Sequence, residues 1–124
     1  MPRDDRHLID RLADAVEAAD SILEWTTGRS FDDYLRDKLF RSAVERQFML
    51  LGEALGAADK QDRTLRSRIP ELGNIVGTRN AIAHGYFAID DTVIWSVANE
   101  LLVATRTRIQ AVLESEEHQD RGDR

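Results

Sequence analysis

The chain has 124 residues, a formal net charge of −6, 6% aromatic and 32% charged residues, and no cysteine. This length suffices for one domain with one core, and nothing in it requires an oxidising compartment or a thiolate metal site. The acidic balance argues against a general nucleic-acid coating protein, because phosphate affinity comes mainly from Lys and Arg. No apolar run approaches the roughly 20 residues of a membrane span, and the N-terminus has no apolar stretch of the signal-peptide kind. We expect a cytoplasmic protein without membrane contact.

The first part of the chain predicts two long helices joined by a short helical turn. Apolar residues recur at three- and four-residue spacing from about Asp5 to Thr27. Gly28 suits the left-handed position that follows a helix end. The run Ser30-Phe31-Asp32-Asp33 resembles a capping box with Asp in place of Glu, which opens the short turn. A nearly continuous apolar stripe then predicts a helix that continues to about Ala58.

The middle of the chain predicts a loop followed by a third long helix. Gln61 to Ser67 is polar and arginine-rich, which indicates a loop. Pro70 fits the first position of a helix, where its missing N–H is not needed. This helix is expected from about Glu71 to Ala83 or His84, with Gly85 as its stop signal.

The last part of the chain predicts one more long helix and a tail. Asp90 or Asp91 can cap a helix from about Thr92 to Glu114. The charged segment from Ser115 to Arg124 is expected to be disordered. Residues 1–114 are therefore expected to form a single domain, with residues 115–124 outside it. Four main helices and one short extra helix predict an all-α fold, an up-and-down four-helix bundle.

Two features of the middle segment bear on partners. Gly73 and Gly77 are four residues apart on one face of the third helix, and each costs about 1 kcal/mol relative to alanine in a helix. Two interpretations are open: a locally weak helix, or a close approach to another helix of this chain or of a second copy. From Lys60 to Asn80 there are five basic residues against two acids. A local basic face on an acidic protein is therefore expected.

Reactive side chain types are concentrated between Arg79 and Tyr86. Asn80 and His84 are four residues apart and share a helix face. On a straight helix, Arg79 and His84 point about 140° apart and lie about 7.5 Å apart along the axis, so one helix does not aim both at one atom. A helix that ends at His84 could free the imidazole. Alternatively, a two-fold partner could bring a second Arg79 and His84 to the same cleft.

A cleft with two histidines and two arginines suits RNA cleavage. Attack of a ribose 2′-OH on its own phosphate needs a base for that hydroxyl and an acid for the leaving 5′-oxygen, and histidine can serve as either. A guanidinium can stabilise the charge that gathers on the phosphate, and Asn80 could hold the imidazole or contact the phosphate. No metal or other cofactor is needed, and His7 and His118 lack ligand spacing.

A plainer interpretation is also open for these residues. A histidine at a helix end often only faces the last carbonyl groups. Arg79 would then be a solvated charge, and Tyr86 would be a rim residue with its ring buried.

The order Arg, polar residue, three residues, His, one residue, Tyr resembles the signature of HEPN-domain proteins, and in particular of the HepT-type ribonuclease toxins of toxin–antitoxin pairs. The resemblance covers roughly Arg3 to Leu113. Its further segments in this sequence are Arg41 to Gln47, Leu51 to Ala54, Ile69 to Leu72, Ile75 to Asn80 and Tyr86 to Asp90 with Val93 and Trp95.

The resemblance implies a HEPN-like homodimer with the motif in a cleft between protomers. Arg79 and His84 match the catalytic pair of a metal-independent endoribonuclease acting on RNA (mRNA or tRNA), and Asn80 matches the polar position beside the arginine. Tyr86 matches a tyrosine that, in some members, the partner antitoxin adenylylates. That antitoxin is a minimal nucleotidyltransferase (MNT), as in type VII-like systems.

Glu53 is a further candidate for the active site, as an acid inside an apolar stripe. It could instead only pair with an arginine, Arg79 or Arg46. Two other functions are considered for the whole chain. One is a non-catalytic helical subunit that docks a nucleotidyltransferase and helps to bind its nucleotide or substrate. The other is a plain helical dimer without a site.

Overall fold

The computed structural model describes residues 5–84 and 90–122 of the chain, with side chains for 7–84 and 90–122. Within these ranges the regular structure is entirely helical, which confirms the predicted all-α class. The helices are α1 (Asp5–Thr26), α2 (Phe31–Arg36), α3 (Lys38–Gln61), α4 (Leu65–Arg68), α5 (Leu72–His84), α6 (Asp91–Ser96), the π-helical segment η1 (Val97–Leu101) and α7 (Leu102–Gly122).

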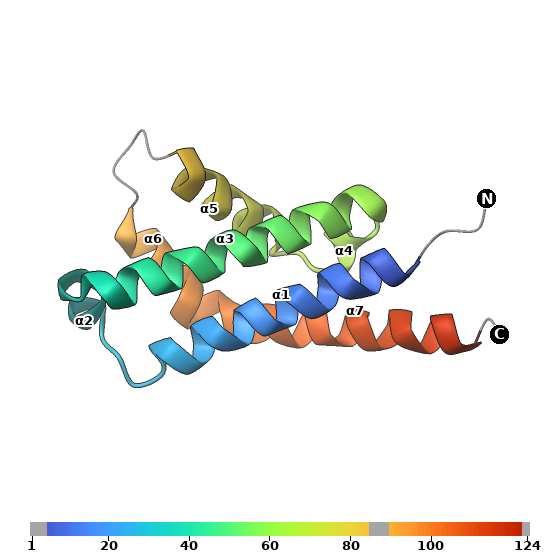
Figure 1. Ribbon diagram of the computed structural model, residues 1–124, viewed down its shortest axis with the longest axis horizontal. Helices are drawn as coiled ribbons and strands as arrows, with labels where there is room; N and C mark the ends of the chain where they lie inside the picture. The colour runs from blue at the N-terminus through green and yellow to red at the C-terminus, as the bar shows by residue number, and fades with distance from the viewer. Residues whose placement is uncertain (1–4, 85–89, 123–124) are drawn as a thin grey trace.

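Two long helices occupy the centre of the molecule. α1 packs against α3 and against α7, and α3 also carries α5 on its other side. In Figure 1, α1 runs antiparallel to both α3 and α7. In the apolar stripe of α1, Leu8, Leu12 and Ile22 are fully buried between the neighbouring helices. The same core receives Phe48 and Leu55 from α3, so the crossing of α3 with α5 rests on a fixed frame.

The turn between α1 and α3 confirms the local sequence signals. Gly28 has a positive φ of 77°, the left-handed conformation expected after a helix end. Ser30 accepts a hydrogen bond from the backbone N–H of Asp33, and the Asp33 side chain accepts one from the N–H of Ser30. This is the predicted capping box. Asp37, which the sequence did not single out, caps α3 by accepting from the N–H of Phe40 at 3.0 Å.

The predicted loop from Gln61 to Ser67 is wrong in part, because Gln61 is the last residue of α3 and Leu65–Ser67 belongs to α4. Leu65 and Ile69, one helical turn apart, are both fully buried. These two apolar residues stabilise a short helix within an otherwise polar and charged stretch.

The predicted disordered tail is also wrong for residues 115–122, since α7 continues to Gly122. Glu116 is buried at 3% exposure, and its Oε1 accepts a hydrogen bond from Nη1 of Arg68 at 3.1 Å. A distant arginine therefore neutralises a residue that made the segment look like a solvated tail. Residues 123 and 124 lie outside the described part of the chain.

The last predicted helix begins as expected and then changes geometry. The Asp90 side chain accepts from the N–H of Thr92 at 3.0 Å and so provides the N-cap. α6 leads directly through η1 into α7, and all three form one continuous helical path. No helix among the described residues has both the length and the apolar character that crossing a membrane would require.

Candidate functional site

The site is organised by the crossing of α3 and α5 at Gly52. Gly52 is buried, and a Cβ at this position would lie 2.2 Å from Cβ and 2.7 Å from Cγ of Arg79. Real Cβ atoms do not approach that closely, so only glycine allows α5 to lie where it does. The crossing therefore fixes the root of the Arg79 side chain. This role of Gly52 was not predicted from the sequence, although a glycine inside an apolar helical stripe can indicate a close approach.

The Arg79 guanidinium is held between two neighbours. Its Nη2 lies 3.4 Å from Oε1 of Glu53, and its Nη1 donates to Oδ1 of Asn80 at 3.2 Å. Its Nε is buried and has no hydrogen-bond partner among the described residues. The Arg79 side chain is 31% exposed. The predicted pairing of Glu53 with an arginine is thus confirmed for Arg79, but Glu53 itself is exposed rather than buried.

His84 is the last residue of α5 and is exposed. Because α5 is helical from Leu72 through His84, Arg79 and His84 leave the helix about 140° apart, as the sequence spacing requires. The structure brings Glu53, Arg79 and Asn80 together, and His84 lies one helical turn after Asn80 on the same helix, in a different direction from Arg79. Gly85 and Tyr86 lie outside the described residues.

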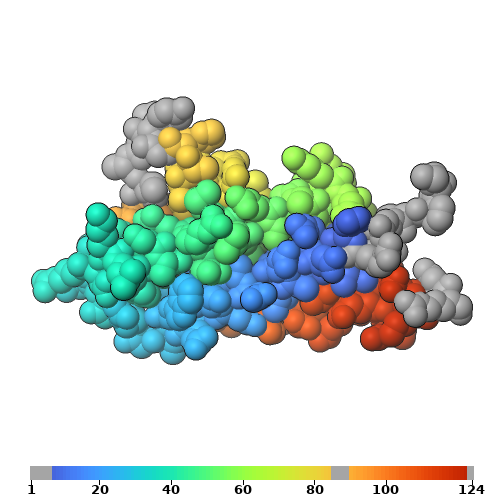
Figure 2. Space-filling view, viewed as in Figure 1, coloured from blue at the N-terminus to red at the C-terminus, as the bar shows by residue number. Residues whose placement is uncertain are grey.

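A groove runs along α3 and α5 from this cluster. Its first part encloses about 410 Å³ and is lined by Gly52, Glu53, Gly56, Ala57, Lys60, Val76, Arg79 and Asn80. A second part of about 640 Å³ shares Gly56, Lys60, Val76 and Asn80 with the first and extends to Arg63 and Arg66. Figure 2 shows this region as a notch in the edge of the molecule, between α5 (gold) and the last turns of α3 (light green).

The expected basic face is only partly present. Arg68 pairs with the buried Glu116, and Arg63 and Arg66 share Asp59, which lies one residue before the counted window. The hydrogen bond from Arg66 holds the pKa of the Asp59 carboxyl below its usual range, so this acid is ionised at neutral pH. The remaining positive charge is concentrated at the groove.

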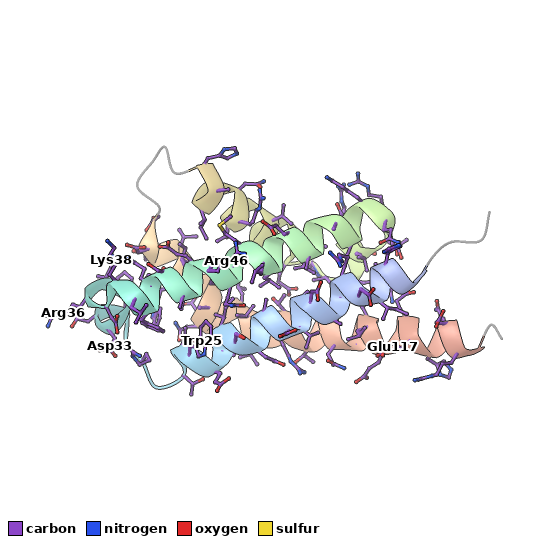
Figure 3. The ribbon with its side chains drawn as sticks, viewed as in Figure 1. Trp25, Asp33, Arg36, Lys38, Arg46 and Glu117 are labelled. Atoms are coloured by element: carbon purple, nitrogen blue, oxygen red, sulfur yellow. The ribbon has the colours of Figure 1, made fainter. Side chains whose placement is uncertain are left out.

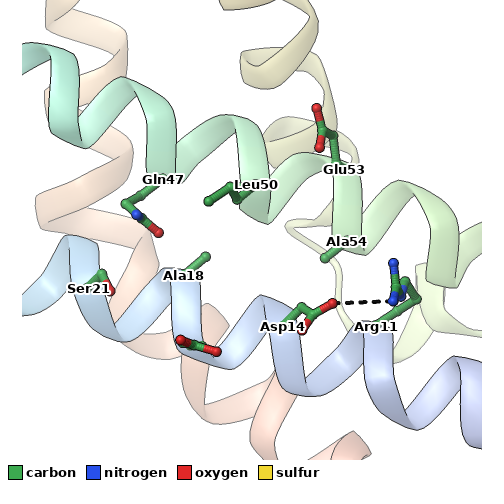
Figure 4. Close-up of a pocket in the computed structure, with 9 residues that line it drawn as sticks. Arg11, Asp14, Ala18, Ser21, Gln47, Leu50, Glu53 and Ala54 are labelled. Atoms are coloured by element: carbon green, nitrogen blue, oxygen red, sulfur yellow. Dashed lines mark ion pairs between the residues drawn. The ribbon is translucent and has the colours of Figure 1, made fainter.

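A second hollow, between α1 and α3, has the opposite character. It encloses about 420 Å³, and Arg11 is its one base beside the acids Asp14, Glu17 and Glu53. Figure 4 shows Arg11 and Asp14 paired on α1, with Glu53 on α3. An acidic lining disfavours a polyanion. Glu53 thus stands on the ridge of α3 that separates the two hollows.

Gly73 and Gly77 do not approach another helix of the chain. A Cβ at either position would meet nothing within 4 Å. Both are exposed and line the groove. Contact of this face with a second copy stays a prediction. Among the side chains of 7–84 and 90–122, no three His, Asp or Glu residues are grouped as metal ligands.

Known sequences resemble most of the chain. The family described as Ribonuclease HepT-like matches residues 15–112. A protein of Thermococcus cleftensis assigned as ribonuclease HepT is 33% identical over 91 residues, which is 73% of this chain and 82% of that protein. Two proteins of Methanocaldococcus jannaschii assigned as RNases are 28% identical over 82% of this chain and 92% of their own and 26% identical over 97% of both chains. No solved structure matches the chain.

Proposed function

This chain belongs to the HepT-like ribonuclease family, and we propose that it is a toxin endoribonuclease that cuts mRNA or tRNA in the cytoplasm without a metal ion. The observation that carries the proposal is the placement of Arg79. It is fixed by the close approach at Gly52, stands at a groove, and keeps guanidinium donors available beside Asn80. A pre-positioned guanidinium is what a phosphorane-like transition state requires.

The proposed reaction is an internal transesterification. One imidazole takes the proton of the ribose 2′-OH as the 2′-oxygen forms a bond to phosphorus. The bond from phosphorus to the 5′-oxygen breaks, and a second imidazole gives that oxygen its proton. The products are a 2′,3′-cyclic phosphate and a free 5′-OH. Arg79 stabilises the negative charge on the non-bridging oxygens, with Asn80 at its side and Glu53 limiting its rotation.

A homodimer supplies the second histidine in this proposal. Within one chain, Arg79 and His84 diverge on α5, so one protomer does not place both at a single phosphate. A two-fold axis beside α5 would bring two copies of each residue to one cleft. The HEPN-like four-helix arrangement and this dimer are parts of the proposal.

Regulation by a nucleotidyltransferase antitoxin completes the proposal. Tyr86 follows His84 by two residues. An adenylyl group on its oxygen would put a phosphodiester charge and a purine beside the histidine. The charge can pair with Arg79 and the base can fill the cleft, which would block RNA.

The test is expression in cells of the wild-type chain, Arg79→Ala and His84→Ala, with growth and RNA integrity measured in the same cultures. We expect that only the wild type stops growth and degrades RNA. If all three behave alike, the nuclease proposal fails and the docking-subunit function takes its place. With the cognate antitoxin co-expressed, Tyr86→Phe should stay toxic while the wild type is neutralised. Neutralisation of Tyr86→Phe by adenylylation elsewhere would contradict the role of Tyr86.

A further inference from the structure

Asp59 holds two arginines at once near the end of α3. Its side chain is 10% exposed. Nη1 of Arg63 lies 2.9 Å from Oδ2, and Nε and Nη2 of Arg66 lie 3.0 Å from Oδ1 and 3.1 Å from Oδ2. A carboxylate that accepts from several guanidinium donors restricts their orientation. The two arginines are therefore fixed in place before any ligand arrives.

This cluster keeps a surplus of positive charge and of donors. The single negative charge of the Asp59 carboxylate neutralises only one of the two positive guanidinium charges. Within the described residues, Nη1 of Arg66 and Nη2 of Arg63 have no hydrogen-bond partner. Both side chains are 62% exposed. Arg106 offers a contrast, since it forms a similar two-pronged pair with Asp20 but is the one base paired with that acid in the described part of the chain.

The surplus charge lies on the path that leads from Arg79. The two parts of the groove together carry four bases (Lys60, Arg63, Arg66 and Arg79) and two acids (Glu53 and Asp59). This excess stands out on a chain of net charge −6. Along α3, Glu53 and Asp59 are six residues apart, about 9 Å of helix rise. A few nucleotides of single strand cover such a separation.

We propose that Arg63 and Arg66, held by Asp59, form a phosphate-binding subsite for the RNA strand that leads away from the scissile phosphate at Arg79. The inference rests on the proposed function and extends it, because it assigns a backbone contact outside the reacting nucleotides. Lys60 lies between the two positions and belongs to the same track. Contacts of this kind act on any sequence and raise affinity for long RNA over short RNA.

A purely structural role explains less of the geometry. The pair of Asp59 with Arg66 joins α3 to α4 and would stabilise that junction alone. A structural role does not explain why Arg63 pairs with the same acid. Nor does it explain why both arginines, which line the groove, keep N–H donors without a partner among the described residues. A second copy of the chain could also occupy the groove, and the experiment distinguishes that case.

The first experiment measures binding in a His84→Ala background, which prevents cleavage. The probe is a fluorescein-labelled single-stranded RNA of about 12 nucleotides, titrated between 50 and 200 mM salt. Arg63→Gln and Arg66→Gln should each reduce the slope of log affinity against log salt by the contribution of one phosphate contact. Between 50 and 200 mM salt, each variant should therefore lose about 2.5-fold less affinity than its background. Arg106→Gln is the matched control, with the same loss of charge and of a two-pronged pair. It should leave the salt slope unchanged.

The second experiment measures cleavage with His84 intact. Arg63→Gln/Arg66→Gln should cleave the 12-nucleotide RNA with a several-fold higher KM and should cleave a dinucleotide at the wild-type rate. Cleavage of the dinucleotide by the variant at the wild-type rate would also show that the variant is folded. If the variant cleaves both substrates as the wild type does, or binds the 12-nucleotide RNA as well as its background does, the subsite proposal is wrong.

Two further outcomes separate the proposals. Loss of dimerisation in Arg63→Gln/Arg66→Gln, measured by sedimentation, would show that the groove is an interface between copies and would overturn the subsite. If the wild type cleaves nothing while the His84→Ala chain binds RNA through Arg63 and Arg66, the nuclease function fails and the subsite stands.

Discussion

At the scale of single residues, the position of Arg79 depends on Gly52. The α3–α5 crossing leaves no room for a side chain there, because the nearest clashing atom is Cβ of Arg79, whose position is set by the backbone of α5. The position of Arg79 is therefore a consequence of helix packing as much as of its own contacts, which are few and long.

Gly52→Ala should force α3 and α5 apart and displace Arg79. We expect a loss of about 1–3 kcal/mol in the free energy of unfolding, the usual cost of overpacking, and a larger loss of cleavage than of stability. Urea unfolding and cleavage rates check this. Gly56→Ala is the matched control for unfolding, because its Cβ would meet only Cγ2 of Val76 at 4.0 Å, an ordinary contact. Equal unfolding effects of the two substitutions would contradict the crossing as described.

At the residue scale, only part of the candidate site could be predicted from the sequence. The contact of Arg79 with Asn80 could be anticipated, because neighbouring positions on a helix are local information. The Glu53–Arg79 pair joins two helices 26 residues apart, and the sequence left Arg79 and Arg46 both open as the partner of Glu53. The role of Gly52 could not be anticipated, since it depends on a residue 27 positions away that only the packing of two helices brings close. The charges between Lys60 and Asn80 likewise suggest too large a basic face, because Asp59 and Glu116, which pair with these arginines, lie outside that segment.

At the scale of elements, local sequence signals predicted where helices begin. They failed where contacts between residues distant in sequence determine whether a helix forms or where it ends. The capping box at Ser30 and the N-cap at Asp90 involve residues within three positions and were anticipated. The end of α7 depends on Arg68 reaching Glu116, 48 residues away in sequence, so charge composition alone suggested disorder. In the same way, α4 forms because Leu65 and Ile69 are buried against the core.

The junction between α3 and α4 should make stability depend on pH through Asp59. Its pKa is lowered in the folded state, so its contribution is present above the unfolded value of about 4 and is lost as pH falls through the folded value. Asp59→Asn should therefore destabilise by about 1 kcal/mol at pH 7, and the difference from wild type should shrink below about pH 4. Thermal unfolding across this range measures it.

Asp14→Asn is the control for that series. Asp14 pairs with Arg11 at 3.5 Å on the exposed face of α1, where both side chains are about half exposed. Exposed pairs of this kind contribute little, so its unfolding should match the wild type at each pH. A constant difference between Asp59→Asn and wild type down to pH 2 would mean that a lost packing contact, and not the carboxylate charge, explains the effect.

At the scale of the whole molecule, charge divides along α3. An acidic hollow lies on the α1 side and a groove with excess positive charge on the α5 side, with Glu53 between them. Charged side chains also extend from the far end of the molecule, such as Arg36 and Lys38 near α2 in Figure 3. An overall acidic chain can thus present one groove with excess positive charge to RNA.

In the proposed function, two protomers together form one metal-independent site. The most direct measurement is RNA cleavage in EDTA by the purified wild type, Arg79→Ala, His84→Ala and an equal mixture of wild type with His84→Ala. Differently tagged copies verify that protomers have exchanged in the mixture, so that about one quarter of the dimers are wild type on both sides.

We expect cleavage by the wild type, with 2′,3′-cyclic phosphate ends, and none by either variant. The mixture should retain about one quarter of the wild-type activity, because a dimer with one histidine lacks either the base or the acid. Activity of about one half would mean that each protomer cuts alone. Cleavage that survives His84→Ala, or that disappears in EDTA, would contradict the mechanism.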